Sequence, residues 1–446
     1  MSKGIAQLLK RSTVLMVARI IGGGLAFAMN IMIARWFGAD VLGQFALAMA
    51  LASLLAVLLP AGMQSIAVLF VSRYVADDKL SHARGFVRSG YLHIAVVTTA
   101  FAGLLAAGAP LLSEQVERDT LWSGAVALMI APALALINFN CGVLTGFKQQ
   151  MLGLLPDLLV KPALIFSAVA ALALLSASAS SLMVISLVCA AMWLTAAGQL
   201  IAMRRSVRFA ETAADTSEKA EWRKAATPWI AITLMWDYFI ELHLLLAGLV
   251  LAPGKIGLLH ICFRLRVLAA FGVRALHSLV MPDVYAADAK NDQRGFERGL
   301  AKINFLTLAY SLMVSFAMLI AGEFILGLVD ESFKSGYGML LAISAAMIPR
   351  AVFGPTTAIM AMKGLQVPVV WIVALGVVLS LVLSLALLPT FGVSAFAIAY
   401  LTSCTFIAFF QWQWALKRTG IDCSVFSSLK VLMNTSVGHR IRQAFA

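Results

Sequence analysis

One stretch of this strongly apolar sequence carries five side chains that could bind an anion: His260, Arg264, Arg266, Arg274 and His277. At about 100° per residue in a helix, His260, Arg264 and Arg274 fall within an arc of about 80°, with Arg266 and His277 on a neighbouring strip. Guanidinium groups bind phosphate through a bidentate fork. The pattern therefore predicts a cationic stripe lining a cavity for an anionic solute. Pairing with nearby carboxylates, or snorkelling to the membrane surface in the case of Arg274, are the alternatives.

Two carboxylates precede this stripe. Asp237 and Glu241 stand four residues apart in "WDYFIELHLLL", which predicts one turn of spacing on one helix face. With His260 they could form a proton or sodium coupling site, or they could compensate the arginines. The number of arginines nearby favours compensation. Asn138 and Asn140, in "LINFNCG", are expected to form hydrogen bonds between helices.

Three further basic residues lie inside apolar runs, where an ionisable group costs at least a few kcal/mol and so suggests a function. Arg350 lies in "AMIPRAVFGPT", whose two prolines are expected to bend the helix toward the cavity and give Arg350 a substrate or gating role. Arg19, about two turns into the first run, could bind substrate or reach the inner interface. Lys161 follows Asp157 by four residues, so cavity lining and an internal ion pair are both open.

The elements that position these residues are expected to be membrane-spanning helices. Hydrophobic residues make up 61% of the 446, charged residues only 12%, and the mean hydropathy is +0.93. Apolar runs recur near the length of roughly 20 residues that crosses a bilayer. Twelve spans are predicted, at about 12–34, 43–72, 89–109, 120–144, 155–176, 180–202, 228–252, 256–281, 300–324, 337–362, 367–390 and 394–416. The second contains Pro60 and Gly62, which predict a kink.

The distribution of charge predicts the topology. Most Lys and Arg residues fall in alternate connections, whereas the opposite connections hold only Arg35, Arg118, Lys255 and Lys334. By the positive-inside rule both termini are then cytoplasmic. This distribution, rather than nucleic-acid binding, accounts for the net charge of +13. The first run contains Arg19 and is followed by no cleavage site, so it is expected to be a retained helix.

Several classes of chemistry are not predicted. The five cysteines include no CxxC pair, so neither disulfides nor a metal site are expected. The sequence contains no GxxxxGK[ST], HExxH or GxSxG motif. We therefore expect no enzyme activity, no cofactor and no direct use of ATP.

Two nearly identical pentapeptides indicate an internal duplication. "RGFVR" occupies Arg84–Arg88 and "RGFER" occupies Arg294–Arg298, and each follows a matched glycine, Gly43 or Gly257, by about forty residues. Each half has an even number of spans, which predicts parallel repeats around a central cavity. The predicted domains are a six-helix bundle at 1–212, a second at 213–417 and a basic cytoplasmic tail at 418–446.

Three stretches resemble a known family. "ARWFGADVLGQFALA", "ILGLVDESFKSGYGMLLAISAAMIPRAVFGPTTAIMAMKGLQ" and "LLPTFGVSAFAIAYLTS" are similar to helix turns of polysaccharide-export flippases of the Wzx type. These belong to the superfamily that also holds the MATE antiporters and the lipid II flippase. The similarity runs over most of residues 1–420, and it implies the same all-α, MATE-like fold.

The resemblance implies flipping of an undecaprenyl-pyrophosphate-linked oligosaccharide, an O-antigen or exopolysaccharide repeat unit, across the bacterial inner membrane by alternating access. The cationic cavity would hold the pyrophosphate and sugars while the lipid tail stays in the bilayer. Implied partners are the lipid-linked oligosaccharide, membrane lipids, a proton or sodium ion and other polysaccharide assembly proteins. A MATE-type multidrug or cation antiporter and a lipid II flippase are the alternatives. A drug antiporter, however, would be expected to have an acidic cavity.

Overall fold

The computed structural model describes residues 2–113, 118–175, 179–207 and 213–433, and these residues form helices joined by short connections. They divide into two compact units, Met1–Gly257 and Leu258–Ala446. The long helix α11 (Pro253–Ala289) begins in unit 1 and runs through unit 2. The all-helical prediction is confirmed.

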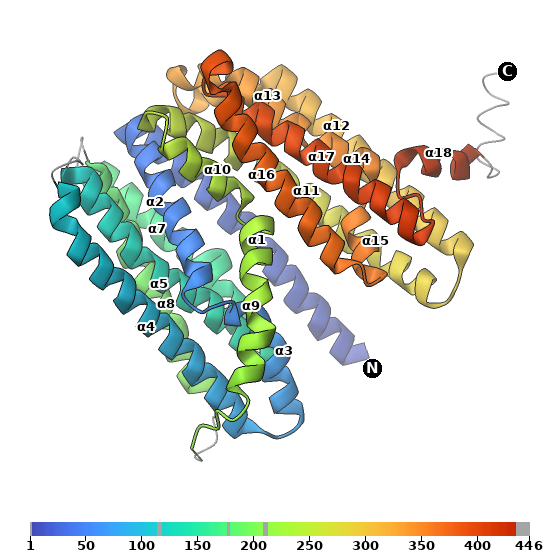
Figure 1. Cartoon of the computed structure of the whole chain (residues 1–446), viewed down its shortest axis with the longest axis horizontal. Coiled ribbons are helices and arrows are strands. Elements are labelled where there is room, and N and C mark those ends of the chain that lie inside the picture. The colour runs from blue at the N-terminus through green and yellow to red at the C-terminus, as the bar shows by residue number, and fades with distance from the viewer. Residues whose placement is uncertain (1, 114–117, 176–178, 208–212, 434–446) are drawn as a thin grey trace. The chain divides into compact units, whose positions relative to one another are not determined.

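Unit 1 is a helical bundle in which α5 packs against α2, α3, α4 and α8 (Figure 1). Its elements are α1 (Ser2–Phe37), α2 (Ala39–Leu58), α3 (Met63–Ala76), α4 (Leu80–Ser113), α5 (Arg118–Gly146), α6 (Gln150–Leu155), the π-helical segment η1 (Pro156–Val160), α7 (Lys161–Leu175), α8 (Ser181–Ser206), α9 (Lys219–Trp236) and α10 (Phe239–Gly248).

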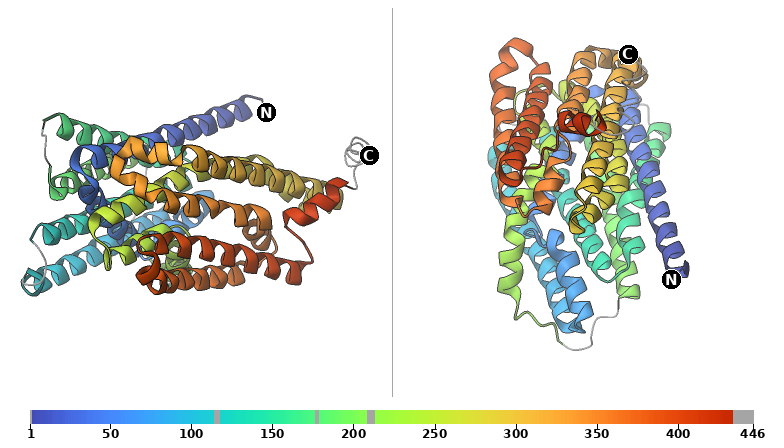
Figure 2. Two further views of the ribbon diagram at one scale, coloured as in Figure 1. Left: turned by 90° about the horizontal axis from the view of Figure 1, so that it is seen from above. Right: turned by 90° about the vertical axis from the view of Figure 1, so that its right-hand side faces the viewer.

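In unit 2, α16 and α17 lie side by side, and α17 also packs against α13, α14 and α15 (Figure 2). Besides α11, its elements are α12 (Gln293–Val329), the 3-10 helix η2 (Glu331–Gly336), α13 (Tyr337–Ala345), α14 (Met347–Phe353), α15 (Thr356–Met362), α16 (Gln366–Phe391), α17 (Ser394–Thr419) and α18 (Val425–Met433).

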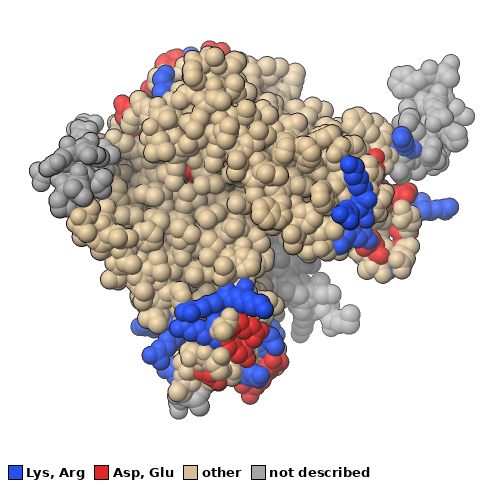
Figure 3. Space-filling model, viewed as in Figure 1, with Lys and Arg blue, Asp and Glu red and all other residues tan. Residues whose placement is uncertain are grey.

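The lengths and composition of these helices make the protein a multi-pass membrane protein. Eleven helices of the described chain are long and apolar enough to cross a membrane, or twelve if the bent pair α9–α10 is one span. Large apolar side chains such as Leu174, Ile320 and Trp371 are exposed on them. On the face seen in Figure 3, charged side chains gather toward helix ends and leave uncharged surface between. Such a surface suits lipid.

Helix breaks occur where the sequence contains proline and glycine. The predicted kink in the second span is confirmed, because α2 ends before Pro60 and α3 begins after Gly62, whose φ is +79°. The tenth span is split into α13, α14 and α15, with Gly354 at φ +78° beside Pro355. The seventh span is bent by 63° between α9 and α10. This last break was not predicted, because "MWDYF" contains neither proline nor glycine.

The two units meet in the sequence at Gly257, whereas the predicted bundles meet at 212/213. The helices of the seventh span explain the difference, since α10 packs on α2 and α9 packs on α3, both within unit 1. The prediction of two six-helix repeats concerns ancestry and topology, and it stays a prediction.

Matched turns nevertheless support the duplication. Asp78 and Asn291 both have a positive φ, 56° and 54°, in the turn before a pentapeptide. In each turn the next residue donates its N–H to the carbonyl five residues back, at 2.8 Å and 2.9 Å. Lys148 and Gly364 form a second such pair, and both following bonds measure 2.8 Å. A left-handed residue closing a helix in this way is a common C-cap.

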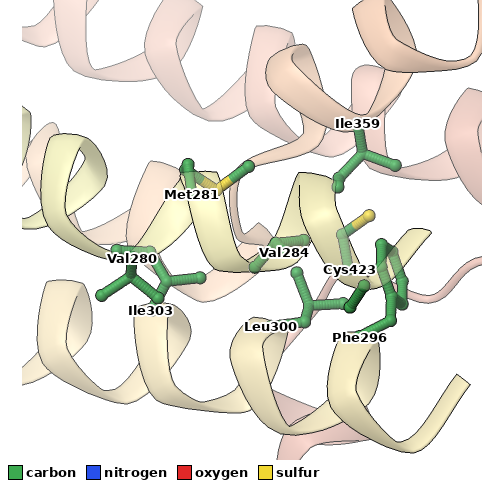
Figure 4. Packing of buried hydrophobic residues seen from close by; sticks show 9 residues of the cluster. Val280, Met281, Val284, Phe296, Leu300, Ile303, Ile359 and Cys423 are labelled. Atoms are coloured by element: carbon green, nitrogen blue, oxygen red, sulfur yellow. The ribbon is translucent and has the colours of Figure 1, made fainter. Parts of the chain in front are cut away.

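The two pentapeptides occupy equivalent positions. Each lies in the first turns of a long helix, α4 or α12, with its arginines exposed and its phenylalanine, Phe86 or Phe296, buried. Phe86 packs edge-on against Trp222, with ring centroids 5.4 Å apart. Phe296 joins a cluster that includes Cys423 (Figure 4). Each phenylalanine thus packs against the segment that follows the last helix of its half, at Trp222 or at Cys423.

Candidate functional site

The cationic stripe lies on α11, within unit 2. His260 is buried, and the Nε of Arg264 donates to its Nε2 at 3.3 Å. This contact is the one expected for residues four apart on a helix. A neutral imidazole accepts that bond, so the remaining Arg264 N–H groups stay directed away from His260. The bond to His260 therefore fixes the position of the Arg264 guanidinium on the predicted arc of α11.

Arg266 lies against an aromatic ring. Its guanidinium carbon is 5.2 Å from the ring centroid of Tyr400, a buried residue of α17. Phe263 packs edge-on against the same ring at 5.1 Å. The stacking orients the Arg266 plane and is a favourable cation–π contact. Tyr400 was missed in the sequence, although it is the only tyrosine in its span, in "AFAIAYLTS".

The Nε of Arg266 is buried and has no hydrogen-bond acceptor in the described part of the chain. A buried donor without an acceptor costs roughly 1–3 kcal/mol. An anionic ligand atom would relieve that cost, and this makes Arg266 the most informative residue of the site.

Arg350 lies on the short helix α14, between the break at Ala346 and the break at Gly354. Its charge interacts with Tyr400 and with His277 of α11. The helix break predicted from the prolines is therefore present. Tyr400 of α17 thus interacts with Arg266 of α11 and Arg350 of α14, and Arg350 also interacts with His277, further along α11.

We call Arg264, Arg266, Arg350, His277 and Tyr400 the arginine cluster. Within the described residues of unit 2, no carboxylate forms an ion pair with any of its arginines. A group of positive charges inside a membrane protein attracts an anion. Phosphate oxygens are the ligands that such guanidinium groups bind best.

Two other predicted basic residues lie outside the cluster. Arg274 is exposed, two turns beyond Arg266 on α11, in keeping with a side chain that could snorkel. Arg19 is exposed on α1 in unit 1. Whether either contributes to substrate binding stays a prediction.

The acidic residues gather in unit 1 instead. Tyr238, in the break between α9 and α10, interacts electrostatically with Asp237, Glu241 and Asp157, and Asn138 also influences its hydroxyl group. The helix is interrupted between Asp237 and Glu241, so the prediction that they share one face of a continuous helix is wrong. Compensation of the arginines by these carboxylates stays a prediction.

Lys161 forms an ion pair with Asp157, four residues earlier, so the ion-pair interpretation is confirmed for this residue. Asp157 belongs to the π-helical segment η1, which begins at Pro156. Such segments occur frequently at functional sites. Asn140 accepts a hydrogen bond from the Tyr91 hydroxyl at 2.5 Å, the interhelical role expected of it. Among the described residues, no group of His, Cys, Asp and Glu side chains could hold a metal ion.

No protein-family model and no curated protein match the sequence. Solved structures do match. An inward-facing multidrug resistance MATE family transporter of the MOP superfamily gives a TM-score of 0.73 at 11% identity, over 92% of this chain and 99% of that one. The lipid II flippase MurJ in an inward closed conformation gives 0.74 at 12% identity, over 95% and 90%. At this identity the likeness shows a shared fold.

Proposed function

We propose that the protein moves a lipid-linked anionic substrate across the membrane by alternating access. The specific substrate we propose is an undecaprenyl-pyrophosphate-linked oligosaccharide, the repeat unit of an O-antigen or exopolysaccharide. The observation that carries the proposal is the arginine cluster of unit 2. It combines guanidinium groups, a buried donor without an acceptor on Arg266, and no paired carboxylate among the described residues of that unit.

The charge of the cluster distinguishes between substrate classes. A pyrophosphate offers several oxygens to Arg264, Arg266 and Arg350, and hydrogen bonds between charged groups are about twice as strong as neutral ones. A cationic drug would be repelled by the same residues. The shared fold includes both a multidrug transporter and a lipid II flippase, so the arginine cluster favours the flippase class.

The carboxylates of unit 1 support coupling to an ion gradient. Asp237, Glu241 and Asp157 all interact electrostatically with Tyr238 in the membrane-spanning part of unit 1. Carboxylates in such a place bind a proton or a sodium ion. The setting we propose is a bacterial inner membrane, with both termini cytoplasmic and other polysaccharide assembly proteins nearby.

The test is a flipping assay with the full-length protein in liposomes that contain a fluorescent polyprenyl-pyrophosphate oligosaccharide. Transfer to the outer leaflet is followed by access of a glycan-cleaving enzyme. Arg266→Ala should slow transfer about tenfold or more, since a hydrogen bond to a charged group contributes about 1.5–3 kcal/mol. Arg266→Lys keeps the positive charge but loses the bidentate guanidinium fork. Its transfer rate should therefore lie between those of the unmodified protein and of Arg266→Ala.

Lys334→Ala is the matched control, because Lys334 is a cation of the same unit that is already paired with Glu331. It should leave transfer unchanged. Unchanged transfer in both Arg266→Ala and Arg350→Ala would contradict the proposal. Transfer of a fluorescent cationic drug, without transfer of the glycolipid, would identify a multidrug antiporter instead.

A further inference from the structure

The short helix α18 presents two different faces. Ser424, just before the helix, and Ser428 are buried on one side. Phe426 and Leu429 are 61% and 42% exposed, and Lys430 is exposed with them. Residues spaced by three and four lie on one face of a helix. Among residues 425–430, the outward face of α18 is therefore apolar, with the positive charge of Lys430 beside it.

Hydrogen bonds fix the rotation of α18 about its axis. The side-chain amide of Asn304 on α12 donates to the carbonyl of Cys423 at 2.8 Å and to the hydroxyl of Ser428 at 2.9 Å. The carboxylate of Asp422 accepts from the Trp412 indole at 2.9 Å and from the Ser424 N–H at 3.0 Å. These hydrogen bonds therefore keep Phe426 and Leu429 on the exposed side of α18.

Buried packing anchors the same segment. Cys423 is fully buried among residues of α11, α12 and α15, including Val284, Leu300 and Ile359 (Figure 4). Gly354 lies against it so closely that a Cβ there would be 1.9 Å from the carbonyl oxygen of Cys423. We call residues 420–424 the strap, because they join α17 to α18 and close over this end of unit 2.

The residues before the strap locate the membrane surface. Trp414 is 40% exposed near the end of α17, and the guanidinium of Arg418 lies 5.7 Å from its ring centroid. Exposed tryptophan followed by Lys417 and Arg418 is the pattern of a helix leaving a bilayer. Because α18 begins six residues after the last helical residue of α17, Thr419, it begins at the level of the headgroups.

We infer that α18 is an interfacial helix that binds anionic phospholipid headgroups of the bilayer in which the protein resides. Phe426 and Leu429 enter the boundary between headgroups and acyl chains, while Lys430, and Arg418 at the end of α17, contact lipid phosphate. Basic residues beside an apolar face bind anionic membrane surfaces in this way. This inference does not depend on the substrate.

The test uses the full-length protein in nanodiscs of phosphatidylcholine, with or without phosphatidylglycerol. A benzophenone amino acid replaces either Phe426 or, as the control, Ser427, which is only partly exposed at a different angle of the helix. After illumination, lipid adducts are counted by mass spectrometry. We expect several-fold more adducts from position 426, a yield that rises with phosphatidylglycerol, and a loss of that rise in Lys430→Glu.

Adducts from position 426 to protein instead of lipid would overturn the inference, as would equal yields from both positions. Yields that do not respond to phosphatidylglycerol would overturn the anionic-headgroup part. Asn304→Ala tests the hydrogen bonds that Asn304 donates to Cys423 and Ser428: if they hold the outward face of α18, this variant should reduce the difference between positions 426 and 427. An undiminished difference would show that α18 is not held by Asn304.

Discussion

The starts of α4 and α12 carry nearly the same pentapeptide, but they hold the segments that dock on them by different chemistry. At α4, Trp222 donates its indole N–H to the Tyr74 hydroxyl at 2.7 Å, and Tyr74 donates to Glu218. At α12, Cys423 lies in an aliphatic cluster, and Asn304 supplies the hydrogen bonds. The position at which the segment docks is thus the same in both halves, whereas the contacts that hold it differ. The buried phenylalanine of each pentapeptide is therefore where the segment docks, and the arginines beside it are exposed.

The two docking positions should differ most in the contribution of their docked side chains to stability. Trp222→Ala removes a fully buried aromatic residue and should lower the free energy of unfolding of unit 1 by about 3–5 kcal/mol. Cys423→Ala removes only a sulfur atom and should cost about 1 kcal/mol in unit 2, on the scale of one buried methylene. Hydrogen exchange resolved by unit measures both, and equal losses would show that the two docks are energetically alike.

The glycines of the two pentapeptides also differ in what lies next to them. A Cβ on Gly85 would lie 1.7 Å from the backbone carbonyl oxygen of Asp215, whereas a Cβ on Gly295 would lie 2.2 Å from a carboxylate oxygen of the Asp292 side chain. Backbone cannot move as easily as a side chain. Gly85→Ala should cost about 1–3 kcal/mol.

Gly295→Ala should cost less, about 1 kcal/mol at most, for weakening the Asp292 cap. Thermal unfolding in nanodiscs gives the order of the two variants. A larger loss for Gly295→Ala would contradict the packing argument.

The smallest expected difference concerns pH. Burial alone would raise the pKa of Asp422, but hydrogen bonds from Trp412 and Ser424 outweigh it and hold the pKa below its usual value. Hydrogen bonds from Ser217 likewise lower the pKa of Asp215, which is open to solvent. A lowered carboxyl pKa stabilises the fold above the unfolded value of about 3.9, and that stability is lost as pH falls through the folded value.

Below about pH 4, protonated Asp422 should release the strap, seen as faster hydrogen exchange at Cys423 and Ser424 after correction for intrinsic rates. Asp422→Asn should remove this dependence on pH. The linker near Asp215 should respond less, because solvent screens an exposed carboxylate. An equal response at both places would mean that the Trp412 bond contributes nothing.

Much of the fold follows from local sequence. Every span predicted from an apolar run corresponds to a helix, or to a broken helix, in the structure. The reason is that a segment crossing the bilayer must satisfy its own backbone hydrogen bonds. Proline and glycine located the breaks near Pro60 and Arg350 for the same local reason. The break at Tyr238 left no such signal, since it depends on what α9 and α10 pack against.

Only part of the candidate site could be predicted from the sequence. Residue type and helical spacing identified Arg264, Arg266 and Arg350 as groups in need of an anion, because burying an unpaired charge is costly in any fold. Tyr400 could not be found, because an aromatic residue in an apolar span is ordinary until a guanidinium from another helix lies over its ring.

The sequence by itself determined that this is a helical membrane protein, approximately where its spans lie along the chain, and which charges inside them need an explanation. Those properties depend on residues close together in the chain. Only the tertiary structure decided which distant residues meet: Arg266 with Tyr400, Phe86 with Trp222, and Asn304 with Cys423. Such contacts depend on how helices pack, and packing follows from the shapes of many side chains together rather than from any local pattern.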